Sequence, residues 1–258
     1  MKKKYKLLKD DTIIVNGTTL YRIEAVCSFN NVDKGNKGGY IENEKNLSQI
    51  GNCWVFDNSI VYDKAKVYGN AQVFENSIVC DNAKVFNNAL VYGKVKLCDN
   101  AEVCGNATVY KNALIYNYGK VCGNATVSGS AKICDYAGVY GNAVVEDNAV
   151  AKGNAMICDN AFVGDNAIVC GNSIVDGRAE ICGNAEIRRT SDYYFGNTIS
   201  GNRKHFTYTR SNKMWKVKRF YGTGKDLIEK TKRENEINGR EFELIVKYVE
   251  ELYSELKY

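Results

Sequence analysis

The sequence of 258 residues contains no proline, a single histidine and no long apolar run. Without proline, its turns must be made by glycine, asparagine and aspartate. No apolar stretch approaches the ~18 to 20 residues that a membrane-spanning helix needs, so we expect no membrane span. The basic start, MKKKYKLLKDD, is followed by no apolar signal-peptide core, which predicts a cytoplasmic protein.

Ten cysteines and a net charge of +5 complete the composition. In a cytoplasmic protein, cysteines are expected to be free thiols rather than a disulfide framework. A mildly acidic middle lies between two basic ends. This pattern argues against an acidic DNA mimic and is too weak for a dedicated nucleic-acid coat.

A repeat of six residues dominates the middle of the chain. From Val55 to Ile187, all but one of the 23 positions spaced six apart are Val, Ile or Leu, the exception being Ala151. Two residues before each lies a small side chain, alanine in 17 of 23 units, and the unit reads N-A-x-V-x-[GD]. A period of six does not fit an amphipathic helix, which needs spacings of three and four.

Each unit predicts one short strand followed by one corner. The small residue and the aliphatic residue are two apart, so both face the same side of a strand. Gly and Asn at the corner tolerate positive φ, and asparagines at matching corners can form hydrogen-bonded ladders. Three strands and three corners close a triangular coil of 18 residues, and stacked coils bury a continuous apolar column.

This pattern resembles the left-handed parallel β-helix proteins with hexapeptide repeats, and the handedness is implied by that resemblance alone. The predicted fold is mainly β: a left-handed parallel β-helix of 18-residue coils over residues 53–189. An N-terminal cap over residues 1–52 includes a β-hairpin at residues 12–26, where an NG turn joins two β-rich runs. A C-terminal α+β cap over residues 190–258 holds a second hairpin, HFTYTR and KMWKVKRFYG, and helical segments.

Two helices are expected in the C-terminal cap. DLIEKTKREN predicts a short helix. The apolar residues from Phe242 onward follow three-and-four spacing, which indicates an amphipathic helix; the set is Phe242, Ile245, Val249, Leu252, Tyr253 and Leu256.

The lead-in GGYIENEKNLS, residues 38–48, and the segment YGTGKDL, residues 221–227, carry a second resemblance. They are similar to a family of phage and prophage hexapeptide-repeat proteins, in which a Gly-Gly-aromatic-Ile-Glu segment precedes the repeats. This resemblance implies a role in the conflict between phage and bacterial host.

Catalysis is the first functional hypothesis, because well-known proteins with this repeat are acyltransferases that use a histidine general base and acyl-CoA. No histidine lies in the coils, no loop interrupts them, and the only histidine is His205. We therefore expect no catalytic residue, no cofactor and no enzyme, and keep an acyltransferase using His205 as the alternative.

Eight of the cysteines directly follow an inward aliphatic residue. Cys80 and Cys98 are 18 apart, as are Cys104 and Cys122, so each pair should stack on adjacent coils. A zinc site needs about four converging ligands. Columns of two on different faces do not supply them, so no metal site is expected.

The residue after each inward aliphatic points outward, and these columns predict binding surfaces. One begins with aromatic residues, and a second does so more briefly; the expected partner-binding residues are Phe56, Phe74, Tyr92, Tyr110, Tyr68 and Phe86. The third face carries an apolar strip, which is typical of association. We expect a homodimer or homotrimer through Ile60, Tyr62, Ile78, Leu114, Tyr116, Val150 and Ile168, with coverage by the C-terminal helix as the alternative.

The C-terminal hairpin interleaves cations with aromatic residues. The expected partner-binding residues here are Arg203, Lys204, Arg210, Lys213, Trp215, Lys216, Lys218 and Arg219. Such a surface can bind an acidic protein or single-stranded nucleic acid, although a solvated basic hairpin fits it as well.

These features favour a non-catalytic binding scaffold in the cytoplasm of a bacterial host. With the phage resemblance, they predict an inhibitor of a host defence or regulatory protein, such as a CRISPR effector. The alternatives are a hexapeptide-repeat acyltransferase and a nucleic-acid-binding protein that uses the basic hairpin.

Overall fold

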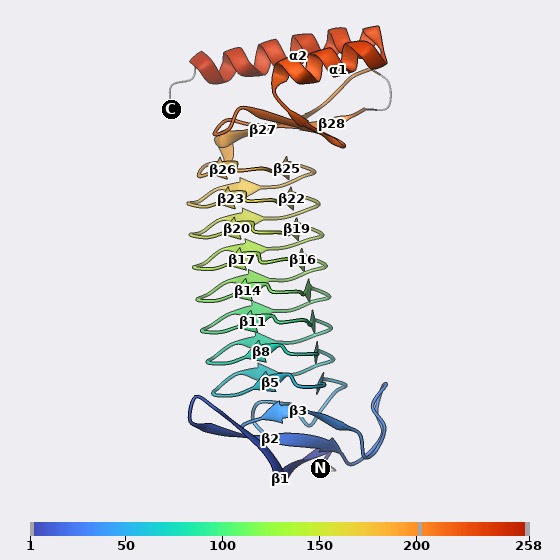
Figure 1. Cartoon of the computed structure of the whole chain (residues 1–258), viewed down its shortest axis with the longest axis vertical. Helices are drawn as coiled ribbons and strands as arrows, with labels where there is room; N and C mark the ends of the chain where they lie inside the picture. The colour runs from blue at the N-terminus through green and yellow to red at the C-terminus, as the bar shows by residue number, and fades with distance from the viewer. Residues whose placement is uncertain (1–2, 201–202, 256–258) are drawn as a thin grey trace.

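The computed structural model describes residues 3–200 and 203–255. A parallel β-solenoid of about eight turns forms the middle of the molecule, and an antiparallel cap closes each end (Figure 1). The predicted solenoid, built from 23 two-residue strands, is confirmed. Among the described residues, no helix is both long and apolar enough to cross a bilayer.

The strands of the solenoid form three parallel ladders, one on each face. The β5–β26 face comprises β5 (Ile60–Val61), β8 (Ile78–Val79), β11 (Lys96–Leu97), β14 (Leu114–Ile115), β17 (Lys132–Ile133), β20 (Val150–Ala151), β23 (Ile168–Val169) and β26 (Glu186–Ile187). The β4–β25 face comprises β4 (Trp54–Val55), β7 (Gln72–Val73), β10 (Leu90–Val91), β13 (Thr108–Val109), β16 (Thr126–Val127), β19 (Val144–Val145), β22 (Phe162–Val163) and β25 (Glu180–Ile181). The β6–β24 face comprises β6 (Lys66–Val67), β9 (Lys84–Val85), β12 (Glu102–Val103), β15 (Lys120–Val121), β18 (Gly138–Val139), β21 (Met156–Ile157) and β24 (Ile174–Val175).

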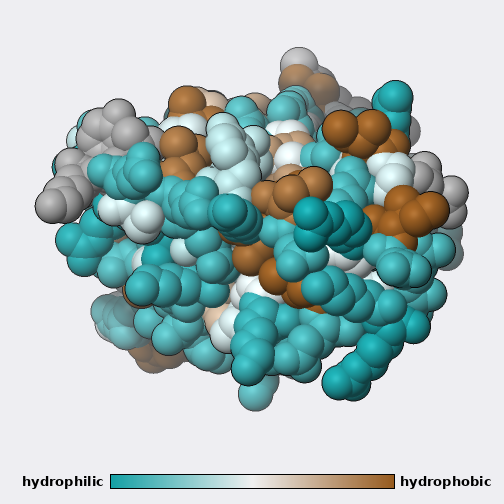
Figure 2. Space-filling model, turned by 90° about the horizontal axis from the view of Figure 1, so that it is seen from above, coloured by the Kyte–Doolittle hydropathy of each residue, from teal (hydrophilic) through white to brown (hydrophobic). Residues whose placement is uncertain are grey.

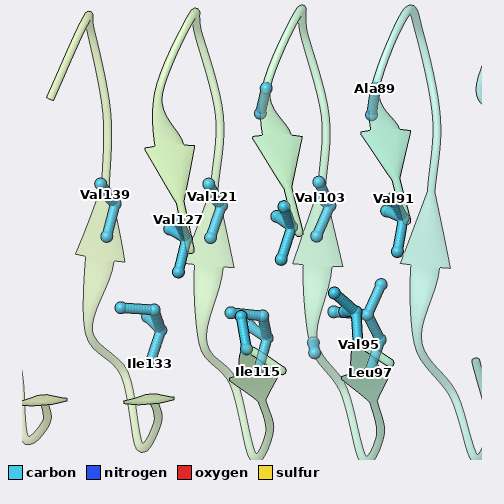
Figure 3. Packing of buried hydrophobic residues seen from close by; sticks show 14 of the residues in the cluster. Ala89, Val91, Val95, Leu97, Val103, Ile115, Val121, Val127, Ile133 and Val139 are labelled. Carbon is cyan, nitrogen blue, oxygen red and sulfur yellow. The ribbon is translucent and has the colours of Figure 1, made fainter. Parts of the chain in front are cut away.

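Within each ladder, paired residues are 18 positions apart in the sequence. Val103, for example, pairs with Val85 on one side and Val121 on the other. The inward aliphatic side chains therefore stack in columns along the solenoid axis (Figure 3). Every inward residue from Val55 to Ile187 is buried, including Ala151, so the core is continuous from one cap to the other.

Corners follow the predicted chemistry with one refinement. The residue before each corner asparagine, usually Gly or Asp, takes the left-handed conformation, while the asparagine itself extends the ladder. At Gly93 (φ +96°), an added Cβ would lie 2.5 Å from the carbonyl oxygen of Lys111 on the next coil. The predicted asparagine ladder is confirmed from Asn70 through Asn142, with Nδ2–Oδ1 distances between 2.9 and 3.0 Å.

The N-terminal cap is a three-stranded antiparallel extension of the β5–β26 face. β1 (Tyr5–Val15) and β2 (Thr18–Ala25) form the predicted hairpin about Asn16 and Gly17, which both have positive φ. β2 pairs with β3 (Lys37–Ile41), and β3 pairs in parallel with β5. The edge of β5 in the first coil is thereby covered, whereas β4 and β6 are the end strands of their own sheets.

The C-terminal cap is a four-stranded antiparallel sheet covered by two helices (Figure 1). After a short 3-10 turn at Thr190–Asp192, the sheet runs through β27 (Tyr193–Asn197), β28 (His205–Thr209), β29 (Met214–Val217) and β30 (Phe220–Gly222). The predicted hairpin is confirmed in β28 and β29, but its second segment, KMWKVKRFYG, turns at Lys218 and Arg219 into β30 instead of forming one strand, and β27 was not expected.

Both predicted helices are present. α1 (Gly224–Glu234) begins at the Thr223 cap, and α2 (Glu236–Glu255) starts six residues before Phe242. Both pack on the sheet through a buried apolar cluster: Phe206, Tyr208, Trp215, Val217, Leu227, Phe242, Val246 and Val249. Of the predicted apolar set, Leu256 lies outside the described residues.

Candidate functional site

His205 lies at the start of β28, on the side of the sheet that faces the solenoid. Side chains alternate along a strand, and the next odd position, Thr207, accepts a hydrogen bond at Oγ1 from the backbone N–H of Glu180 in the last coil, at 2.9 Å. Phe206 and Tyr208 point the other way, into the cluster under the helices. The imidazole is therefore held at the junction between the solenoid and its cap.

Two side chains hold the imidazole. Nδ1 contacts Oδ1 of Asn197 in β27, and Nε2 lies 2.8 Å from a guanidinium nitrogen of Arg178, at a corner of the last coil. The ring also stacks on Phe195 at a centroid distance of 5.9 Å. An amide oxygen can only accept, so Nδ1 carries the proton and Nε2 presents its lone pair toward Arg178. This is the tautomer that a general base acting through Nε2 requires.

Neither Arg178 nor Asn197 was a candidate from the sequence. Arg178 lies 27 residues from His205 and occupies a corner position within the regular repeat. Asn197 belongs to a strand that the sequence did not predict, and its pairing with His205 across β27 and β28 brings the two together. A strand prediction for YYFGN, which ends eight residues before the only histidine, would have identified Asn197 as a candidate.

A hollow of about 720 Å³ lies in the cap, on the other side of the sheet. Tyr208, Arg210, Lys213, Lys225 and Tyr253 are among its lining residues. Because His205 faces the solenoid, this hollow and the imidazole do not form one site. Among the described residues, no group of three His, Cys, Asp or Glu side chains is arranged to hold a metal ion.

The basic hairpin offers fewer side chains for binding a partner than its sequence indicates. Trp215 is fully buried, and its Nε1 donates to Oε1 of Glu250 in α2 at 3.0 Å. The expectation that Trp215 binds a partner is therefore wrong, because the helices cover it.

Several cations of the hairpin have partners within the chain. Lys204 pairs with Glu234 at 3.7 Å and Lys216 with Glu180 at 3.5 Å. The guanidinium of Arg210 lies 6.0 Å from the ring centroid of Tyr253. Arg203, Lys213, Lys218 and Arg219 are exposed.

The aromatic columns are confirmed as stacked rings. Phe56 and Phe74 stack at 4.5 Å between centroids, Tyr92 and Tyr110 at 5.1 Å, and Tyr68 and Phe86 at 4.9 Å. These rings are half-buried, apart from Tyr68 at 36% exposure. Tyr118 and Tyr136 form a fourth pair at 4.8 Å and are more exposed, at 51% and 65%, but the sequence reasoning did not select them, because they are corner residues.

The apolar strip of the third face is partly covered within the chain. Ile60 and Tyr62 are buried beneath the hairpin of β1 and β2, where they pack with Leu20 and Tyr40. Ile78 is half-buried at the edge of the same cluster. The expectation that Ile60 and Tyr62 meet a second subunit is corrected, because the N-terminal cap occupies that surface. Leu114, Tyr116, Val150 and Ile168 remain as the predicted interface, beyond the hairpin; α1 and α2 lie at the end of the solenoid and pack on other residues (Figure 1).

The expectation that all cysteines are free is also corrected. Cys104 and Cys122, on adjacent coils of the β6–β24 face, form a disulfide with a Cα–Cα distance of 4.7 Å. Stacking in register, which the sequence did predict, brings them to that distance. Burial raises the pKa of the Cys134, Cys158 and Cys170 thiols, and raises that of Cys182 to about 12. These thiols are protonated at neutral pH, which disfavours them as nucleophiles.

Comparisons with known proteins give two short matches. A family model described as the YdcK beta solenoid repeat matches residues 120–135. The protein described as "Uncharacterized acetyltransferase YdcK" from Escherichia coli (strain K12) is 43% identical over 49 residues. The match covers 19% of this chain and 15% of that protein.

These matches change the functional expectations. Similarity to a protein named as an acetyltransferase overturns the expectation that the chain is not an enzyme and leaves catalysis open. Neither match supports the phage-type resemblance or an inhibitor of host defence. Together with the fold, they support a β-helix protein with a local similarity to an acetyltransferase.

Proposed function

We propose that the chain is an acyltransferase that moves an acetyl or similar acyl group from a coenzyme A thioester to a hydroxyl or amine, with His205 as general base. The observation that carries the proposal is the fixed imidazole at the last coil, with Nδ1 against Asn197 and Nε2 toward Arg178. The local similarity to a protein named as an acetyltransferase supports the same reaction class.

The chemistry assigns one task to each of the three side chains. Nε2 accepts the proton of the acceptor hydroxyl or amine, which then attacks the thioester carbonyl carbon, and the thiolate leaves. The Oδ1 atom of Asn197 keeps Nδ1 protonated, so that Nε2 remains the basic atom. Arg178 is exposed at its corner, so its guanidinium can move away from Nε2 when the acceptor hydroxyl or amine binds there. Its positive charge can also attract an anionic donor or acceptor.

The test is turnover of acetyl-CoA against a panel of hydroxyl and amine acceptors, with free coenzyme A quantified by mass spectrometry so that the protein's own thiols do not interfere. His205→Ala should lower the rate by about 10²-fold or more, which is the usual contribution of a general base. Asn197→Ala should lower kcat less and should shift the pH profile, because the tautomer is no longer fixed.

Lys64→Ala serves as the control, since Lys64 is an exposed corner residue in the first coil, at the other end of the solenoid from the C-terminal cap. Full activity of His205→Ala, or no turnover by the unmodified chain with any acceptor, would contradict the proposal.

A further inference from the structure

A second hollow in the C-terminal cap, of about 260 Å³, lies between α1 and the turn that joins β29 to β30. It is lined by Lys204, Val217, Lys218, Arg219, Phe220, Leu227, Lys230, Thr231 and Glu234. The hollow is on the helix side of the sheet, so it is separate from His205, which faces the solenoid.

The lining of this hollow is strongly cationic. Four Lys or Arg side chains and one carboxylate, that of Glu234, line it. Glu234 pairs with Lys204 at 3.7 Å, and the ammonium of Lys230 lies 5.3 Å from the ring centroid of Phe220. The side chains of Lys218 and Arg219 have neither an ion pair nor a hydrogen bond within residues 3–200 and 203–255. Like charges that line one hollow repel one another, and a bound anion would relieve that repulsion.

The turn places these two cations in the lining of the hollow. Val217 pairs with Phe220, so Lys218 and Arg219 form a two-residue hairpin turn. Lys218 takes φ +52°, where such turns usually have Asn or Gly because a side chain there is strained. A lysine at this position keeps a positive charge at the hollow at some cost in turn stability.

The floor of the hollow is apolar and well packed. Leu227 is 1% exposed and Val217 is 6% exposed. Thr231, the polar residue beside them, already donates from Oγ1 to the carbonyl oxygen of Leu227 at 2.8 Å. Polar recognition is therefore confined to the cationic rim, and the floor offers contact to an uncharged part of a ligand.

We propose that this hollow binds a phosphate-bearing small molecule, with its phosphate or diphosphate group on Lys218, Arg219 and Lys230. A guanidinium donates two parallel hydrogen bonds to phosphate oxygens, and lysine ammonium groups supply charge from other directions. The size of the hollow suits a small ligand rather than a macromolecule. The site does not depend on the acyl-transfer proposal, because it lies on the other side of the sheet.

The probe for the first experiment is sodium diphosphate, titrated calorimetrically into the full chain at low salt. Binding should weaken at least about tenfold in a Lys218→Ala/Arg219→Ala variant, because two charge-assisted contacts are lost. A Lys64→Ala/Lys94→Ala variant removes the same charge from exposed corners of the solenoid and should bind diphosphate as the unmodified chain does.

Lys218→Gly separates binding from folding. Glycine suits φ +52°, so this variant should be at least as stable as the unmodified chain and still bind diphosphate more weakly. Absence of diphosphate binding, or equal binding by all variants, would overturn the proposal. A single-stranded oligonucleotide that binds through Lys218 and Arg219 when diphosphate does not would also overturn it, in favour of nucleic acid.

Discussion

Glu102 is the central charge of a three-residue network on the β6–β24 face. Its carboxylate lies 2.9 Å from the ammonium of Lys84 on the preceding coil and 3.3 Å from that of Lys120 on the following coil. The hydrogen bond from Lys84, with that from Lys120, holds the carboxyl pKa below its ordinary value of 4.5. One carboxylate thereby joins three successive coils.

Glu102→Gln should make the unfolding free energy less dependent on pH in the acid range. The folded-state pKa is lowered, so the network stabilises the protein above about pH 4.5 and this stabilisation is lost as the pH falls through the lowered value. The variant should be less stable by about 1 kcal/mol at pH 7, as expected for a partly exposed pair, and equal to the unmodified chain at the acid end. Urea unfolding at several pH values measures this.

Glu75→Gln is the matched control, because the Glu75 side chain is exposed at a corner and forms no ion pair among the residues that the structure describes. A difference for Glu102→Gln that persists unchanged below the lowered pKa would contradict the assignment of the network.

The β5–β26 face is the element on which self-association is expected. Beyond the N-terminal hairpin, the half-buried side chains of Leu114, Tyr116, Val150 and Ile168 lie along it, with Lys132 paired between Leu114 and Val150. A lysine at position 114 would add a charge between Lys96 and Lys132 on this face without disturbing the inward column, because outward and inward residues alternate.

Leu114→Lys should convert the predicted homodimer or homotrimer to a monomer, measured by light scattering coupled to size-exclusion chromatography. Leu90→Lys makes the same change on the β4–β25 face, where Leu90 is 36% exposed, and should leave the mass unchanged. Equal masses for both variants and the unmodified chain would rule out this face as the interface.

The strands themselves could be predicted because their determinants are local. Each six-residue unit carries its own small residue, aliphatic residue and corner, and every unit formed the expected strand. The fate of Ile60 and Trp215 could not be predicted in the same way. Ile60 is covered by the hairpin of residues 5–25, and Trp215 by a helix 35 residues away. The residues adjacent to Ile60 and Trp215 in the sequence do not indicate either contact.

The candidate site was only partly predictable for the same reason. His205 was identifiable as the only histidine. Its two partners depend on how the cap rests on the last coil, since Arg178 comes from the solenoid and Asn197 from the strand beside it. That docking is a property of surfaces built by the whole chain.

At the scale of the whole molecule, the solenoid behaves as a stack of equivalent coils whose stability is nearly a sum of neighbour terms. Deleting residues 123–140 removes one coil and joins Cys122 to Gly141, where Gly123 stood, so the register of 18 is kept. This variant should unfold cooperatively, as followed by circular dichroism, with only a modest loss of stability.

Deleting residues 126–140 instead removes fifteen residues and breaks the period of six. The aliphatic column would then be interrupted, and the cooperative transition should be lost. If the two deletions behave alike, the coils are not the equivalent units described above.

The ladders have a mechanical consequence. Hydrogen bonds join each coil to the next, so they run along the length of the rod, and the two caps lie at opposite ends (Figure 1). Seen end-on, the C-terminal cap presents a mainly hydrophilic surface with separate apolar patches (Figure 2). A pulling force between the ends of the described chain would act on the hydrogen bonds between one pair of coils after another, so coils would detach one at a time. Each release of 18 residues would lengthen the chain by roughly 60 Å, giving a sawtooth of evenly spaced extensions rather than one abrupt rupture.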